Sequence, residues 1–220
     1  MSGMEHEFEP VRGLPEVLPD GEHIVWQGTP RWQRLAIDAL HVRKVAIYFA
    51  VLLVWRVGDV LAGGGGAGAA LAAAAWTLPL AALAVGLLLL LGWLMARTTV
   101  YTLTNRRVVM RVGVVLNIAF NLPLTRITSA GLRRHRDGSG DITLVLSGPD
   151  RIAYLHLWPH ARPWFVRQPQ PMLRALPDVD RIAALVADAL AVSAGQARAA
   201  RPDVAAAGRP VPAAGTVVAA

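Results

Sequence analysis

Two almost wholly apolar stretches dominate the hydrophobic pattern in the first half of the chain. Residues 76–96 carry no charge and nine leucines. At about 1.5 Å per residue, they would reach roughly 30 Å as a helix, the thickness of a bilayer's hydrocarbon core. Residues 45–62 are apolar except for Arg56 and Asp59, each of which would cost about 2.5–3.5 kcal/mol at the centre of a span. The pattern predicts a transmembrane helical hairpin at 43–96, with helices at about 45–62 and 76–96 and a glycine- and alanine-rich connection between them.

The cations predict how this hairpin is oriented. Arg31, Arg34, Arg43 and Lys44 precede the first span closely, and Arg97, Arg106, Arg107 and Arg111 follow the second, while none lies between residues 57 and 96. Positive residues stay on the cytoplasmic side, so both termini should be cytoplasmic. The first forty residues contain no cleavable signal peptide. The expected location is therefore a bacterial inner membrane, cytoplasmic or intracytoplasmic, crossed more than once.

After the second span the period changes from helical to alternating. Short β-type runs lie at 98–104, 106–113, 115–124, 126–134, 140–147 and 150–158, separated by turn residues such as Asp137-Gly138-Ser139. A proline-rich segment, 159–177, leads to a helix with an N-terminal Asp178 and one apolar side. We expect an α+β protein in which an antiparallel β barrel or sandwich is capped by a C-terminal helix.

Residues before the hairpin should belong to the same unit. Residues 21–30 resemble a strand that needs partners elsewhere, and 31–41 form a helix with one apolar side. That helix either lies at the membrane surface with Trp32 near the headgroups or packs on the soluble domain. The predicted organisation is a cytoplasmic segment at 1–42, the hairpin, a β domain at 97–194 and a disordered tail at 195–220.

Charge favours an anionic partner. Lys and Arg number 22 against 15 Asp and Glu, and the run from Arg97 to Arg136 holds eight arginines and no acid. Anionic lipid or acidic loops of a partner fit best beside two spans. Plain solvated arginines are the second interpretation, and nucleic acid is not expected because no aromatic platform accompanies the cations. The candidate lipid or partner contacts are Trp32, Arg43, Lys44, Arg97, Arg106, Arg107 and Arg111.

Arg56 and Asp59 share a face of the first span. They are a candidate contact for a partner helix within the bilayer. The alternative is a pair near the far interface whose side chains extend toward water.

The sequence offers only weak candidates for catalysis, metal binding or pigment binding. Without cysteine the chain has no disulfide or thiolate nucleophile. Gly63–Gly66 lacks the Lys and Ser/Thr of a phosphate loop, and Ser139 does not match a nucleophile elbow. His156 and His160 lie on a strand-like segment broken by Pro159, which argues against a metal pair. Neither span contains a histidine to ligate pigment. We predict no enzyme activity, no metal and no cofactor.

Several segments carry a family resemblance. YTLTNRRVVMRVG after the hairpin, with GEHIVWQGTP before it, resembles bacterial pleckstrin-homology-like (PH-like) domains fused to membrane helices, which implies a seven-stranded bent sheet capped by one helix. FEPVRGLPEVLPDGE, NLPLTRI, YLHLWPHARPW and QPMLRALPDVD resemble the PuhB family of photosynthetic complex assembly proteins of purple bacteria, from Phe8 to about Ala194. This resemblance implies a non-enzymatic factor whose partners are reaction-centre or light-harvesting subunits and other assembly factors, with self-association left open. The rival interpretation is a generic membrane-anchored module that binds lipid or protein.

Overall fold

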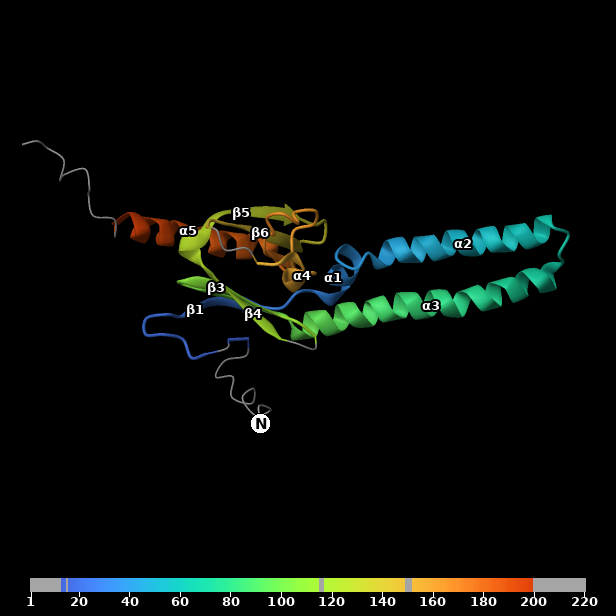
Figure 1. Ribbon diagram of the computed structural model, residues 1–220, viewed down its shortest axis with the longest axis horizontal. Coiled ribbons are helices and arrows are strands. Elements are labelled where there is room, and N and C mark those ends of the chain that lie inside the picture. The colour runs from blue at the N-terminus through green and yellow to red at the C-terminus, as the bar shows by residue number, and fades with distance from the viewer. Residues whose placement is uncertain (1–12, 15, 115–116, 149–151, 200–220) are drawn as a thin grey trace, which may run out of the picture.

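A long helical hairpin projects from one end of a β-rich domain (Figure 1). The computed structural model describes residues 13–14, 16–114, 117–148 and 152–199. Helix α2 (Val42–Ala62) and helix α3 (Ala67–Thr98) run antiparallel, and the turn between them is confined to four residues. The alanine-rich stretch before Trp76 is therefore helical, in keeping with the high helix propensity of alanine. The turn needs glycine at Gly64, whose φ is +82°.

The hairpin is not the core of a soluble bundle. In the most apolar windows of α2 and α3, 0% and 6% of the residues are buried within the protein. Both helices, of 21 and 32 residues, are long and apolar enough to cross a bilayer.

Two antiparallel sheets form the domain. The first has the order β1 (Ile24–Gly28), β2 (Val100–Thr104), β3 (Arg107–Val112) and β4 (Ile118–Pro123). The second consists of β5 (Ile127–Arg134), β6 (Gly140–Leu146) and β7 (Met172–Leu176), and a short 3₁₀ turn, Leu124–Arg126, joins the sheets. The hairpin is inserted between β1 and β2, which are hydrogen-bonded neighbours. The predicted α+β class is confirmed, although in the described residues the sheets remain two open layers without closing into a barrel.

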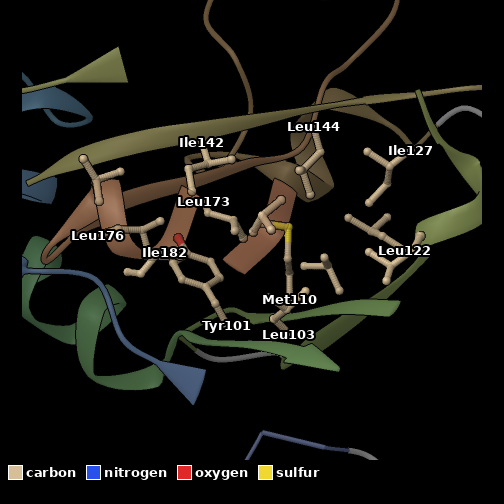
Figure 2. Packing of buried hydrophobic residues seen from close by; sticks show 14 of the residues in the cluster. Tyr101, Leu103, Met110, Leu122, Ile127, Ile142, Leu144, Leu173, Leu176 and Ile182 are labelled. Carbon is tan, nitrogen blue, oxygen red and sulfur yellow. The ribbon is translucent and has the colours of Figure 1, made fainter. Parts of the chain in front are cut away.

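The core lies between the sheets. Figure 2 shows Tyr101, Leu103 and Met110 of the first sheet facing Leu144 and Leu173 of the second, all almost fully buried. Helix α5 (Val179–Ala199) covers this core with side chains on its apolar side. These are Val179, Ile182 and Val186. This arrangement confirms the predicted helical cap; the helix continues past residue 194, and residues 200–220 lie outside the described part.

The prediction of a strand at 150–158 is wrong. Its described portion contains a single helical turn, α4 (Tyr154–Leu157), in which Leu157 is buried and Leu155 is exposed. Strand β6 already pairs with β5 on one side and with β7 on the other, so it offers no free edge. The strand that takes this edge, β7, lies in the segment described from the sequence only as proline-rich, 159–177. Its flanking prolines, Pro171 and Pro177, stand just outside the strand, where proline is tolerated.

Candidate membrane and partner interface

Helix α1 (Trp32–Asp38) is wedged between the hairpin and the second sheet. Leu35 packs with Ala96 of α3 and Ala175 of β7, and all three are buried. Ala36 lies against Gly92, where an added Cβ would stand 2.9 Å from the Ala36 Cβ. The structure therefore shows α1 packed as a domain helix. Trp32 remains 36% exposed, so its contact with headgroups stays a prediction.

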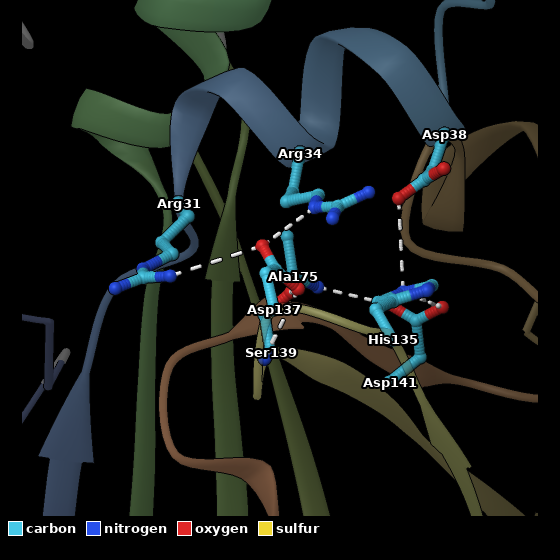
Figure 3. Close-up of polar contacts among 8 residues, drawn as sticks. All are labelled: Arg31, Arg34, Asp38, His135, Asp137, Ser139, Asp141 and Ala175. Atoms are coloured by element: carbon cyan, nitrogen blue, oxygen red, sulfur yellow. Dashed lines mark hydrogen bonds and ion pairs between the residues drawn. The ribbon is translucent and has the colours of Figure 1, made fainter.

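Polar contacts join α1 to the turn between β5 and β6 (Figure 3). Arg34 Nε donates to Asp137 Oδ2 at 2.7 Å, and the backbone N–H of Arg31 donates to the Ala175 carbonyl at 2.8 Å. The Ser139 hydroxyl also donates to Asp137. The hydrogen bond from Arg34, followed by that from Ser139, holds the pKa of Asp137 well below its ordinary value. Asp137 is therefore ionised in the folded protein near neutral pH.

A buried polar group lies behind this ion pair. His135 Nε2 is 3.3 Å from Asp141 Oδ2 and 3.6 Å from Asp38 Oδ2, and Asp141 Oδ1 accepts from the Ala175 N–H. We call Arg34, Asp38, His135, Asp137 and Asp141 the α1 anchor. Its members come from segments about one hundred residues apart in the chain, and sequence reasoning missed it. The function of such an anchor is positional, because it fixes the base of the hairpin to the second sheet.

A second buried network ties the start of β2 to the segment after α4. Tyr101 accepts a hydrogen bond from the Arg174 backbone N–H, and its hydroxyl lies 2.6 Å from His160 Nδ1. The Tyr101 hydrogen is then donated to Nδ1, which leaves His160 protonated on Nε2, facing Thr99 Oγ1 at 3.3 Å. Burial, assisted by the charge of Arg174, lowers the pKa of His160 to about 3. His160 is therefore a neutral structural group.

Most of the predicted contact residues lie at the open end of the hairpin. Arg43 and Lys44 are exposed in the first turn of α2, and Arg97 is exposed in the last turn of α3, 5.2 Å above the Trp93 ring. Antiparallel helices bring these two ends together. Arg111 joins them because it pairs in register with Val100, directly after α3. With Trp32, these residues surround the point where the hairpin meets the domain.

Arg106 and Arg107 lie at the other end of β2. Five strand residues at about 3.3 Å each separate them from α3 by roughly 17 Å. Arg107 Nε donates a hydrogen bond to Glu22 Oε1 at 2.7 Å within an ion pair. Only 2% of the Glu22 side chain is exposed. Burial raises the pKa of Glu22, but hydrogen bonds from Arg107 and Thr104, together with the charges of Arg107 and Arg106, outweigh it and lower that pKa. Arg107 thus has a structural partner far from the hairpin.

Arg56 and Asp59 are exposed in the last two turns of α2, near the hairpin turn. No ion pair joins them in the described part of the chain. A groove between the two helices lies nearer the open end and has a volume of about 400 Å³. It is lined by Ala46, Phe49, Ala50, Leu53, Thr77, Leu78, Ala81, Ala82 and Val85. Its small side chains leave room for a side chain from another molecule.

The geometry for catalysis is poor. The Ser139 hydroxyl donates a hydrogen bond to Asp137 within the turn between β5 and β6. His156 is exposed on α4, while His160 is buried beyond Pro159. In the ranges that the structure describes, no group of three or more His, Asp or Glu side chains has an arrangement that could hold a metal ion.

Comparison with known proteins identifies the family of the chain. The family model of the bacterial PH domain matches residues 42–190. This chain belongs to the bacterial PH domain family. A relative from Rhodobacter capsulatus, named "Uncharacterized 23.7 kDa protein in puhA 5'region", is 38% identical over 190 residues, which are 86% of this chain and 89% of the relative. A crystal structure of a pleckstrin-homology-domain protein from Shewanella loihica aligns with 41% of this chain and 69% of its own length, at 16% identity and a TM-score of 0.28.

Proposed function

We propose that this protein is a non-enzymatic assembly factor for the photosynthetic reaction centre and core light-harvesting complex of purple bacteria. It would act by binding client subunits in and at the inner membrane, with both termini in the cytoplasm. The observation that carries the proposal is the exposed apolar hairpin inserted between two strands of a PH domain and held there by α1. A protein built in this way would have one binding surface within the lipid bilayer and another in the cytoplasm.

Two lines of similarity point to photosynthesis. The motifs at the start and end of the chain resemble the PuhB family. The Rhodobacter capsulatus relative is named for its place in the 5′ region of puhA, a name that shares its prefix with that family. The match extends over most of both chains, so the likeness includes the hairpin as well as the domain.

The groove between α2 and α3 is the surface best suited to a client helix. Helices associate in lipid through close packing at small residues, because burial of apolar surface gives no advantage there. Ala50 and Ala81 supply such a site from the two helices. Arg56 and Asp59, nearer the turn, would add a polar contact to the same client.

The second candidate is a membrane-anchored PH module that binds lipid or protein without a role in assembly. The exposed cations at the open end of the hairpin, Arg43, Lys44 and Arg97, favour it because they suit anionic headgroups. Such a module would be needed equally in cells that make no photosynthetic complex.

Deletion and complementation in a purple bacterium test the proposal. The deletion should reduce near-infrared absorption of the core antenna, and the wild-type gene should restore it. Ala82→Phe fills the groove and should restore less, whereas Ala69→Phe, at an exposed alanine outside the groove, should restore fully. Normal absorption and normal accumulation kinetics in the deletion strain would remove the assembly function.

A further inference from the structure

The loop before β7 carries an unusual set of exposed apolar side chains. Trp164 is 93% exposed, Val166 63% and Phe165 38%. We call residues 163–169 the Trp164 loop. An exposed cluster of this kind on a folded domain usually marks a surface that is covered in use.

The base of the Trp164 loop is fixed by the fold. Ala161 bridges to Pro171, and the Arg162 N–H donates to the Gln170 carbonyl at 2.9 Å. His160, one residue earlier, is buried and contacts Thr99, the residue that follows α3. The loop therefore starts from a closed neck that touches the end of a hairpin helix.

This neck places the tip of the loop within reach of lipid headgroups. Arg97 ends the apolar part of α3, so Thr99 lies at the level of the interfacial layer, which is roughly 5–8 Å deep on each side of a bilayer. Three residues from Ala161 to Trp164 span at most about 10 Å. In Figure 1 the orange loop lies beside α4, in the half of the domain nearer α1 and the hairpin.

The charges around the Trp164 loop favour an anionic lipid surface as its partner. Arg162 and Arg167 flank the apolar residues, and Arg162 lies 4.0 Å above the Phe165 ring. Residues 151–177 contain no Asp or Glu. Tryptophan is enriched at the membrane interface because its ring is apolar with one polar edge, and arginines beside it meet phosphates.

We infer that the Trp164 loop inserts into the headgroup region of the membrane that holds the hairpin, as a second contact between the domain and anionic lipid. Trp164, Phe165 and Val166 enter the interface, while Arg162 and Arg167 contact phosphates. The loop would fix the tilt of the PH domain on the membrane surface. This inference rests on the proposed insertion of the hairpin.

Because the natural chain has no cysteine, single spin labels can test the inference on the full-length protein. Val166→Cys probes the loop, Leu83→Cys probes the exposed face of α3, and Ser129→Cys probes an exposed site on β5. Each labelled protein is placed in nanodiscs of phosphatidylcholine and phosphatidylglycerol. Collisions of the label with oxygen, which concentrates in lipid, are compared with collisions with a water-soluble nickel complex.

The label at position 166 should favour oxygen over nickel by a ratio between those at positions 83 and 129. A ratio equal to that at position 129, with the label at 83 still in lipid, would overturn the loop insertion and leave the hairpin intact. Shielding of position 166 from both reagents would mean that protein covers the loop, and would overturn the inference as well. A label at position 83 that meets water would instead refute hairpin insertion and the proposed function. Gln168→Cys provides an independent test within the same loop.

Discussion

The close contact between α1 and α3 makes Gly92 a sensitive position. Gly92→Ala places a Cβ 2.9 Å from the Ala36 Cβ, and the next nearest atoms belong to the Ala36 backbone. Backbone atoms cannot rotate away, so α1 must shift from the hairpin. Gly86 lies in the same helix and has no atom within 4 Å of an added Cβ. Gly86→Ala is therefore the matched control.

The two variants share the gain from replacing glycine by alanine in a helix, about 1 kcal/mol in water. Their difference isolates the cost of overpacking, about 1–3 kcal/mol. For a chain of this size that corresponds to a lowering of the melting temperature by roughly 2–12 °C relative to Gly86→Ala. Thermal unfolding of the detergent-solubilised proteins measures it, and hydrogen exchange of α1 amides should be faster in Gly92→Ala alone. Equal melting temperatures and equal exchange would show that α1 does not depend on this contact.

The pKa of His160 is about 3 in the folded protein against an ordinary 6.5, so the unfolded chain binds the extra proton between these values. Stability should be full above about pH 6.5 and fall by about 1.4 kcal/mol per pH unit below it, about 2 kcal/mol by pH 5, and His160→Gln should flatten this slope in denaturant unfolding. Glu22→Gln removes the charged partner of Arg107 and should cost about 1.5–3 kcal/mol in the same assay, whereas the exposed Glu16→Gln should change little. Arg56→Leu combined with Asp59→Leu should leave the protein resistant to carbonate extraction but reduce core-antenna absorption, and undiminished absorption would exclude these charges as a client contact.

Features set by neighbouring residues could be predicted from the sequence. The first five strands after the hairpin lie within about three residues of their expected bounds, because alternation and turn residues act locally. The hairpin follows from composition alone. The apolar stripe of α5, from Val179 to Val186, was likewise visible as a helical period.

Features that depend on contacts between distant residues could not be predicted from the sequence. Residues 150–158 alternate as a strand would, but β7 occupies the edge of β6 that they would need. The α1 anchor joins Arg34 to Asp137 across 103 positions. The same limit applies to the predicted lipid contacts, since the pairing of β2 with β3 separates Arg107 from Arg97 and brings Arg111 back to the hairpin.

The position of the hairpin in the chain bears on how an assembly factor could work. Its two ends leave from β1 and β2, where Gly28 pairs with Tyr101, and α1 packs on both α3 and β7. An anchor joined by a flexible linker would let the domain search the membrane surface, whereas this connection keeps the groove between α2 and α3 in a fixed relation to the domain. Under the proposed function, a client that met one surface would be presented to the other at high effective concentration, provided that its own membrane and cytoplasmic parts had the matching geometry. Selectivity would then come from the spacing between two weak contacts, and loosening α1 should impair assembly even when each contact surface is left unchanged.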